Sequence, residues 1–520
     1  MQVTLTSLDY GVIAVYVALL AIIALRASRN AGNSRREYFL AGDRLPWWMI
    51  GGSIVAANIS SHHLVGVMGV AYARGFSAIA IEWATVLLGL NALLWLFLPY
   101  YLRNGFYTMP EYLLRRYGGA ARTLFAFLVL VTYLFVEISA VLYLGAIALH
   151  ALLGLPIRLC VPVIAAATGV YTVFGGLRAV IWTEMLQLAV LLLGGIALAV
   201  ATLHASGGVG AFVATMPQWH LLLPADDPDF PWTMYLGGLT CISVFYCAAN
   251  QFIVQRVLAA RSEWDARMGV VFTDYLKFLL PVIIIVPGLL APRLFPNLER
   301  PDMVFPTLVT NLLPPGLVGL VLAGLLSAVM SHLSGAVNSC ATIATLDIVQ
   351  PWRPMTDAKA VRFGRIAGCV FLLLGVVGAE LLSQRPDRPV FLYLLNAYGY
   401  FTPGIAVMFL AGILWRRANH AGALAAGALT IPLSLAFEWL VPQLSFFNRT
   451  GIVFWLCAAV CVVVSLCTRA PAPAALAGLV WERASAGLPS LDARSAGWRN
   501  PFWWWLLITM VILFFYLRFP

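Results

Sequence analysis

Long apolar segments follow one another along almost the whole chain, and their length limits what the chain can fold into. A helix needs about 20 mostly apolar residues to cross the hydrocarbon core of a bilayer. Fourteen segments meet this requirement, at 7–27, 46–71, 76–102, 122–153, 157–175, 180–203, 232–251, 267–291, 316–346, 362–384, 389–415, 420–441, 450–468 and 500–518. Only 10% of the residues are charged, whereas a soluble domain usually carries about 25%. The sequence therefore predicts an all-α integral membrane protein with about 14 transmembrane helices in a lipid bilayer.

The basic residues gather in every second loop. Clusters follow the first, third, seventh, ninth, eleventh and thirteenth segments, and they include Arg35 and Arg36, Arg115 and Arg116, Arg256 and Arg261, Lys359 and Arg362, Arg416 and Arg417, and Arg494 and Arg499. Loop 204–231, by contrast, has no Lys or Arg and carries three aspartates, Asp226, Asp227 and Asp229. Positive charge marks cytoplasmic loops, so we expect a multi-pass protein of the cell membrane with both termini outside the cytoplasm. This pattern accounts for the net charge of +10, and no nucleic-acid partner is expected.

The eight cysteines lie inside the predicted helices or at their edges. No CxxC pair and no His/Cys cluster has the spacing of a metal site. We therefore expect the cysteines to be small buried apolar side chains, and we expect no cofactor.

Two of the apolar segments contain polar residues in a similar arrangement. The second reads GGSIVAANISS from Gly51, and the seventh reads GGLTCISVFYCAANQ from Gly237. The two segments lie five spans apart, so the charge pattern predicts that they cross the membrane in opposite directions. Paired interrupted helices in two inverted halves indicate the central site of a transporter, because unwound backbone at membrane depth must line a cavity or be buried in protein. We expect these polar residues to face a cavity for a substrate and an ion.

Ionisable residues inside membrane helices are candidate functional residues. Those deepest in apolar sequence are His62, His63, Glu82, Glu137, Glu184, Asp274, Lys277, His332 and Glu380. Asp274 and Lys277 are three residues apart on one helix, so they can also simply neutralise each other. Glu380 and Glu438 lie near predicted outer ends, where water solvates them. Glu137 is either an interhelical hydrogen-bond acceptor or a functional group, and the sequence does not decide between these roles.

The ninth segment, LLSAVMSHLSGAVNS, carries Ser327, Ser331, Ser334 and Asn338 on one helix face. Small residues on one face are also typical of helix–helix contacts in membranes. The alternative is a row of oxygen ligands for a hard cation, which prefers hydroxyl, carbonyl and carboxylate oxygens.

Six ordered blocks resemble the signatures of the sodium/solute symporter family, and most closely its sodium/glucose cotransporter branch. They are YFLAGDRLPWW (38–48), AANISSHHLVG (56–66), YTMPEYLLRRY (107–117), NQFIVQRVLAA (250–260), NSCATIATLDI (338–348) and TPGIAVMFLAGILWRR (402–417). The resemblance implies cation-coupled solute uptake by alternating access. It also implies a leucine-transporter-like core of ten helices, spans 2–6 and 7–11, in two inverted five-helix repeats.

This resemblance sets the expected domain organisation. The core would occupy 38–417, with repeats at about 46–203 and 232–415. Residues 1–37 would form an extra helix and a cytoplasmic loop; no basic residue precedes this helix and no clear cleavage site follows it, so we expect it to be retained. Residues 418–520 would add three helices, with a cytoplasmic linker at 469–499.

The resemblance also assigns residues to two sites. In the solute site it implies His63, Glu82, Thr85, Ser243, Tyr246 and Lys277. In the sodium site it implies the backbone carbonyls of Ala56, Ile59 and Ala328 and the hydroxyl of Ser331. Glu184 stands where the family has an Asp associated with ion passage, and it keeps the charge.

Two positions depart from the family pattern. The family's sugar-contacting Gln aligns with Leu395, which leaves Asn396, one position further, as a rotated substitute. The family's sodium site uses adjacent hydroxyls, whereas here Ser331 is followed by His332. Three arrangements remain open: sodium is held more weakly, a protonated His332 serves as the cation, or the ring points away and Ser327 or Ser334 supplies the missing oxygen.

The sequence therefore predicts a transporter that couples a small polar solute, sugar or sugar-like, to sodium or protons. The alternatives are a proton-coupled or sodium-independent transporter of the same fold, and a solute sensor that retains a transporter core. An enzyme is not expected, because the intramembrane His and Glu residues stand without a HExxH motif, a Ser-His-Asp order or a phosphate loop.

Overall fold

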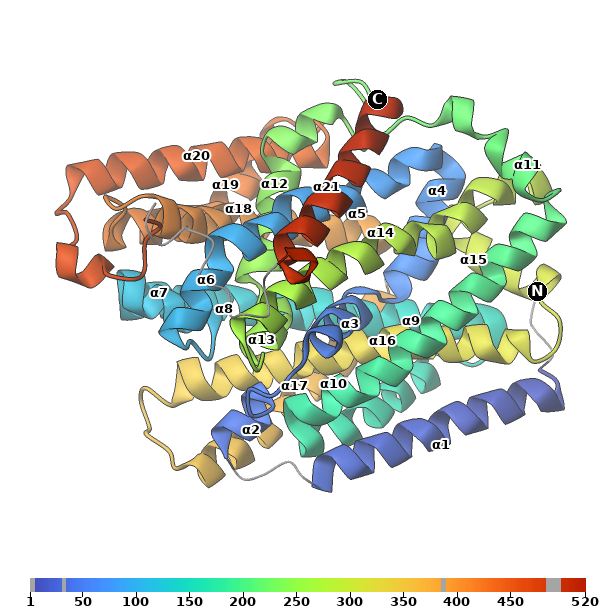
Figure 1. The fold of residues 1–520 in the computed structure, drawn as a ribbon, viewed down its shortest axis with the longest axis horizontal. Helices are drawn as coiled ribbons and strands as arrows, with labels where there is room; N and C mark the ends of the chain where they lie inside the picture. The colour runs from blue at the N-terminus through green and yellow to red at the C-terminus, as the bar shows by residue number, and fades with distance from the viewer. Residues whose placement is uncertain (1–4, 30–33, 385–389, 483–496) are drawn as a thin grey trace.

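The computed structural model describes residues 5–29, 34–384, 390–482 and 497–520, without the side chains of 282 and 390–395. These residues form a bundle of mostly long helices (Figure 1). Eleven helices of the described chain are long and apolar enough to cross a membrane, and one bent pair brings the number to twelve. Segments 157–175 and 180–203 follow each other directly, as two helices that meet at a kink at Gly176 and share the label α10. Segment 46–71 is interrupted at Ile59, as its polar residues predict.

The first half of the core includes α3 (Trp47–Asn58), α4 (Met68–Arg74), α5 (Ala80–Ala84), α6 (Leu98–Asn104), α8 (Gly119–Thr132), α9 (Val141–Leu153) and α10 (Ile157–Ala205). The second half contains α12 (Gly238–Val244), α13 (Gln251–Leu258), α14 (Glu263–Leu294), α15 (Val304–Leu312), α16 (Leu317–Ile343), α17 (Asp357–Ser383) and α18 (Val390–Leu414). Outside the core are α1 (Ser7–Arg29), α19 (His420–Leu440), α20 (Phe446–Cys467) and α21 (Pro501–Arg518). Three further short helices are α2 (Arg35–Leu40), α7 (Met109–Tyr117) and α11 (Val209–Val213).

The junction inside α10 is a kink at Gly176. Gly176 has φ 58°, a conformation that side chains disfavour. A Cβ at this position would also lie 2.7 Å from the carbonyl oxygen of Tyr38. The chain therefore turns between the two predicted spans without a loop.

Both predicted interruptions are confirmed. α3 ends at Asn58, Ile59 is extended with φ −78° and ψ 124°, and the next turn, His62–Val67, is π-helical. In the second half, Asn250 is extended with φ −76° and ψ 117° between the π-helical turn 245–249 and α13. The Asn250 side chain accepts hydrogen bonds from the Phe252 amide and the Tyr133 hydroxyl. The first of these bonds satisfies one of the backbone N–H groups that have no partner within the first turn of α13.

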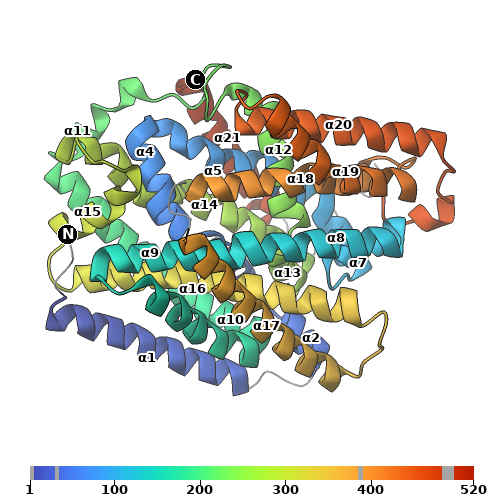
Figure 2. The same ribbon diagram turned by 180° about the vertical axis from the view of Figure 1, so that it is seen from behind.

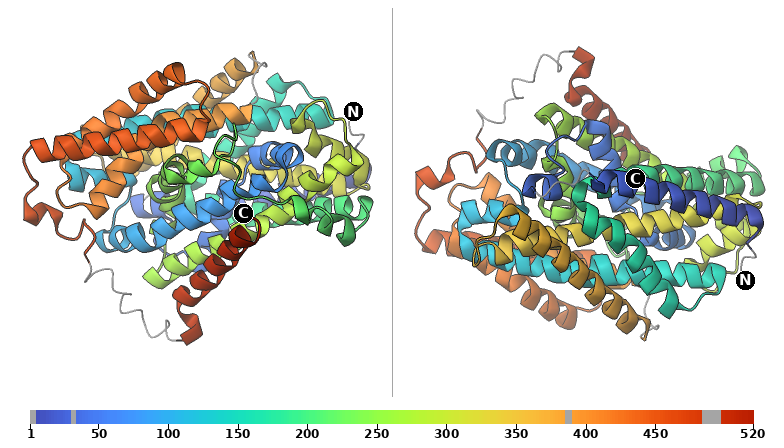
Figure 3. Two further views of the ribbon diagram at one scale, coloured as in Figure 1. Left: turned by 90° about the horizontal axis from the view of Figure 1, so that it is seen from above. Right: turned by 90° about the horizontal axis from the view of Figure 1, so that it is seen from below.

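The long helix α16 lies inside the bundle and packs mainly against α10 (Figure 1). α1 and α20 lie at opposite edges in both side views (Figures 1 and 2). α21 lies at the edge of the bundle and packs against α14 (Figure 3). Hydrophobic side chains of α21, including Phe515, pack on Trp83 and Phe278 next to the centre of the core.

The chain's C-terminal end lies beside the acidic loop 204–231. The Leu221 amide donates to the Phe519 carbonyl at 3.0 Å, and His220 contacts the Pro520 carbonyl. The start of α1 lies beside the start of α16, because the Asp9 carboxylate accepts hydrogen bonds from the backbone amides of Gly316 and Gly319. Leu320 and Val321, near the start of α16, pack against Gly194 in the second half of α10, the helix that leads into loop 204–231.

Candidate functional site

Glu82, Lys277 and His63 meet between the two halves of the core. The Lys277 ammonium donates to Glu82 Oε2 at 2.7 Å, and His63 Nε2 lies 3.1 Å from Glu82 Oε1. The three residues come from α5, from α14 and from the π-helical turn that follows the first break. The side chains of Lys277 and His63 are 3% exposed and that of Glu82 is 14% exposed. The structure therefore places three of the predicted solute residues in one buried charged cluster.

Tyr246 links the first break to the second. Asn58, the last residue of α3, donates from Nδ2 to the Tyr246 hydroxyl at 2.8 Å, so a hydrogen bond connects the two broken helices at this point. Thr85 lies one turn after Glu82, and its hydroxyl donates to the Ile81 carbonyl of its own helix. Ser243 lies one turn before Tyr246, and its hydroxyl has no hydrogen-bond partner among the described residues.

A cavity of about 70 Å³ reaches this cluster from the side of the acidic loop. Its lining includes His62, Glu82 and Ile81 from the core and Phe230 from loop 204–231. Glu82 is the one carboxylate among the residues that line this cavity.

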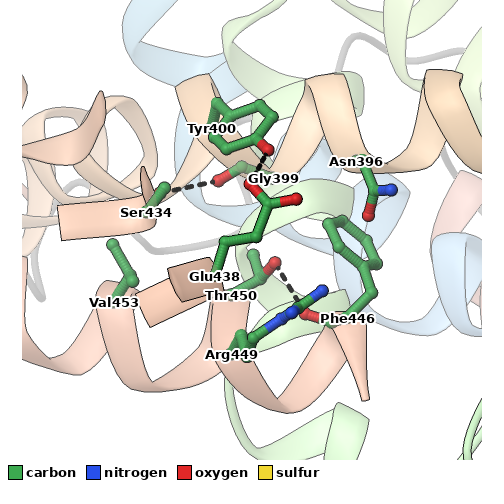
Figure 4. A pocket seen from close by; sticks show the side chains of 9 residues that line it. All are labelled: Asn396, Gly399, Tyr400, Ser434, Glu438, Phe446, Arg449, Thr450 and Val453. Carbon is green, nitrogen blue, oxygen red and sulfur yellow. Dashed lines mark hydrogen bonds between the residues drawn. The ribbon is translucent and has the colours of Figure 1, made fainter. Parts of the chain in front are cut away.

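The structure does not bring Asn396 together with these residues. Asn396 lines a separate small pocket between α18, α19 and α20, together with Tyr400, Ser434, Glu438 and Arg449 (Figure 4). Successive residues of an α-helix point about 100° apart. The Asn396 side chain therefore faces a different direction from the residue at position 395. The side chain of Leu395 lies outside the described residues. In the same pocket, Glu438 accepts a hydrogen bond from the Tyr400 hydroxyl.

The groups expected to bind sodium converge where α16 passes the first break. The Ser331 hydroxyl lies 2.7 Å from the Ala56 carbonyl oxygen and 3.3 Å from the Ala328 carbonyl oxygen. Ile59 is the extended residue of the break itself. Three of the four expected oxygen ligands therefore lie around one point, and the fourth belongs to the adjoining unwound backbone.

His332 is directed to other partners than its neighbour Ser331. Its Nδ1 lies 2.8 Å from the Ala57 carbonyl oxygen, and its Nε2 lies 2.6 Å from Glu137 Oε2. Glu137 also accepts a hydrogen bond from the Tyr398 hydroxyl of α18. The sequence left three arrangements of His332 open. These contacts agree with the one in which the ring points away from the expected sodium ligands. The Ser334 hydroxyl donates to the Ser331 carbonyl, and the Ser327 hydroxyl has no partner within the described chain.

Glu184 lies in a second buried cluster, on the other side of the break. Arg256 Nη2 donates to Glu184 Oε1 at 2.5 Å, and Arg256 Nε donates to the Ser53 hydroxyl at 2.7 Å. Ser53 in turn donates to the Glu184 carboxylate. A Cβ at Gly335 would lie 2.7 Å from Arg256 Nη2, so the guanidinium lies against α16 one turn beyond Ser331. The sequence did not single out Arg256, because it resembled the other arginines of a cytoplasmic loop.

Known proteins share both the sequence pattern and the fold. The pattern of the sodium:solute symporter family matches residues 38–430. The sodium/glucose cotransporter of Vibrio parahaemolyticus is 32% identical over 479 residues, which cover 86% of this chain and 88% of that protein. The human sodium/myo-inositol cotransporter is 32% identical over 537 residues, covering 91% and 75% of the two chains.

Two solved structures show the same arrangement of helices. A Na⁺-coupled sialic acid symporter, substrate-bound and outward-open, gives a TM-score of 0.81 at 19% identity and covers 89% of this chain and 98% of its own. Mhp1, a nucleobase-cation-symport-1 family transporter, gives 0.55 at 15% identity and covers 86% and 98%. The fold and the two interrupted helices define a multi-pass membrane transporter with a leucine-transporter-like core of two inverted repeats. The chain belongs to the sodium:solute symporter family.

Proposed function

We propose that this protein is a symporter that couples the uptake of a small polyhydroxylated solute, a sugar or cyclitol, to sodium. The observation that carries the proposal is the position of the Glu82 carboxylate between Lys277 and His63, beside both interrupted helices. A carboxylate accepts hydrogen bonds from hydroxyl groups, whereas an ammonium donates to them. Both kinds of group are therefore available to a neutral solute with several hydroxyls.

Unused hydrogen-bonding atoms around the two breaks support this solute class. The side-chain oxygen Oδ1 of Asn58 and the hydroxyls of Ser61 and Ser243 are buried and have no hydrogen-bond partner among the described residues. Buried polar atoms are normally hydrogen-bonded, and each exception needs an explanation. A polyhydroxylated solute would supply these partners. The relatives named for glucose and myo-inositol transport agree with a solute of this kind.

The second part of the proposal is a sodium site formed by the carbonyls of Ala56, Ile59 and Ala328 and by Ser331 Oγ. Sodium is a hard cation that prefers oxygen ligands, and the convergence of the Ser331 hydroxyl on two of these carbonyls favours such a site. The ion would take the place of the Ser331 hydrogen bond to Ala56. It would thereby hold the first broken helix against α16, so solute and ion sites would share one mobile element.

Glu184 is proposed to act on the cytoplasmic route of the ion. It lies next to Arg256, whose guanidinium is one turn beyond Ser331 along α16. An ion leaving the Ser331 site towards the cytoplasm would meet this carboxylate. Because Arg256 holds the carboxylate in the present state, the ion pair would have to open before the ion passes.

The test is uptake by the purified protein in proteoliposomes. An inward sodium gradient should drive accumulation of radiolabelled glucose or myo-inositol above equilibrium, and loading the vesicles with unlabelled solute should give counterflow. A sensor would bind the solute without accumulation. Binding without sodium-stimulated uptake or counterflow of any sugar or cyclitol would contradict the proposal.

A further inference from the structure

An aromatic groove lies where α21 begins beside α14 (Figure 1). Its volume is about 600 Å³, and small-molecule sites usually measure about 300–1,000 Å³. On α14 the groove is lined by Trp264, Met268, Phe272 and Tyr275, which recur at helical spacing on one face. The transport function proposed above gives none of these residues a role.

Three of the aromatic rings around the groove use their polar atoms inside the protein. Trp264 Nε1 donates to the Arg499 carbonyl at 2.9 Å, and Trp504 Nε1 donates to the Trp498 carbonyl at 2.8 Å. The Tyr275 hydroxyl donates to the Trp504 carbonyl at 2.9 Å. These bonds hold the first turn of α21 against α14. They also leave the apolar faces of the three rings as the surface that an occupant contacts.

Arg499 gives the lining of the groove a positive charge. No carboxylate is among the lining residues. The two acids in the adjoining first turn of α14, Glu263 and Asp265, pair with other arginines. The groove is therefore apolar along most of its lining and carries an uncompensated guanidinium. An occupant that is apolar along its length and anionic at one end matches both properties.

The groove lies at the cytoplasmic ends of both helices in the proposed topology. α14 begins at Glu263, after the basic cluster of the seventh segment, and α21 begins at Pro501, after the linker 469–499. Trp and Tyr are enriched at this level of a bilayer, and basic pockets between membrane helices on the cytoplasmic side bind anionic lipid head groups. Trp498 is 71% exposed and Trp504 is 37% exposed, so the groove is open to the surrounding lipid.

We propose that this groove binds one anionic phospholipid of the cytoplasmic leaflet. An acyl chain lies on the aromatic faces of α14 and α21, and the lipid phosphate accepts hydrogen bonds from the Arg499 guanidinium, a charge-assisted contact. The lipid also touches the start of the first broken helix, because Trp47 of α3 belongs to the same lining and its ring packs edge-on against Phe272 at 5.1 Å. The bound lipid thus connects α21 to α3 and α14 of the core.

The test measures lipid binding to the purified, delipidated protein by native mass spectrometry. Phosphatidylglycerol and phosphatidylcholine with the same acyl chains differ in head group, and only the first carries a net negative charge. The unmodified protein should bind the first phosphatidylglycerol more tightly than the first phosphatidylcholine. Arg499→Gln should weaken phosphatidylglycerol binding about tenfold, the usual effect of losing a hydrogen bond to a charged group, and should abolish the preference. Arg353→Gln, at an exposed arginine outside the groove, is the matched control and should change neither lipid.

A second pair of variants tests the apolar part of the site. Trp498→Ala removes an exposed wall of the groove and should weaken both lipids several-fold, whereas Trp352→Ala, at a ring that is 83% exposed outside the groove, should not. Equal binding of the two lipids by the unmodified protein, or equal effects of Arg499→Gln and Arg353→Gln, would overturn the site and leave a general lipid belt. If residues 483–496 fill the groove instead, neither Arg499→Gln nor Trp498→Ala will change lipid binding, which also overturns the proposal. Because binding is measured without transport, the result is independent of the proposed solute and ion.

Discussion

Arg256 and Glu184 form an ion pair of 2.5 Å in which neither side chain is more than 1% exposed. The pair joins α13, the second half of one broken helix, to α10. Through Ser53 it also holds α3, the first half of the other broken helix. One charged cluster thus fixes the halves of both broken helices that lie on the cytoplasmic side in the proposed topology. The cavity at Glu82 lies away from this cluster, where Phe230 of loop 204–231 contributes to its lining.

This ion pair gives a stability prediction. Removing one partner of a buried pair leaves an uncompensated charge and typically costs about 3–5 kcal/mol. Arg256→Met and Glu184→Gln should therefore each lower the melting temperature of the purified protein strongly. The double variant should recover much of the loss, because no unpaired charge remains. A double variant that is as unstable as the sum of both single variants would show that the two residues act independently.

A second prediction concerns solute affinity at Glu82. Replacing one buried hydrogen-bonding partner typically costs about 1–3 kcal/mol, which is roughly 5- to 150-fold in affinity. Glu82→Gln should raise the solute concentration at half-maximal uptake within this range, and the purified protein should remain folded. Glu380→Gln is a suitable control, since Glu380 pairs with the exposed Arg158 at the surface of the bundle. An unaltered half-maximal concentration in Glu82→Gln would place the solute elsewhere.

A third prediction concerns the side of the membrane. The arginine pattern requires loop 204–231 and the adjoining C-terminal end to lie outside the cell. Asp226→Cys should react with an impermeant thiol reagent in intact cells, whereas Arg416→Cys should react only after lysis. Both are best made after replacing the exposed Cys369 and Cys467 by Ser. The reverse labelling pattern would invert the proposed topology and place both termini in the cytoplasm.

The sequence was sufficient for features that depend on local composition. Paired glycines followed by hydroxyl and amide residues predicted both helix breaks, because such residues are costly in lipid unless they line a cavity or are buried in protein. Family signatures predicted the meeting of His63, Glu82 and Lys277. By contrast, the spacing of Asp274 and Lys277 allowed a local pair, whereas the structure has Lys277 on Glu82. The spacing of residues along one helix predicts only pairs within that helix. Packing of α14 against α5 brings Glu82 to Lys277 instead.

Other contacts had no signal in the sequence. Arg256 follows a membrane segment as several other arginines do, and only the packing of α13 against α10 and α16 shows that it is buried. Glu137 had two open roles, and the structure assigns it two specific donors, His332 and Tyr398. Asn396 was expected to replace a sugar contact, but helix rotation places it in a different pocket. These outcomes depend on how helices rotate and pack, which local patterns do not determine.

The last prediction concerns the driving ion, because His332 stands beside Ser331 at the proposed sodium site. The ring is bound to the Ala57 carbonyl and to Glu137, so it supplies no oxygen ligand, and imidazole nitrogen is a softer ligand than a hydroxyl. His332→Ser adds a hydroxyl next to Ser331 and should lower the sodium concentration at half-maximal uptake. His332→Ala adds no ligand and is the matched control for loss of the ring, since it should not lower that concentration.

Uptake should be measured against sodium at fixed pH and against pH without sodium. Sodium-independent uptake that rises as the pH falls, and that is lost in His332→Ala, would contradict sodium coupling and make the proton the driving ion.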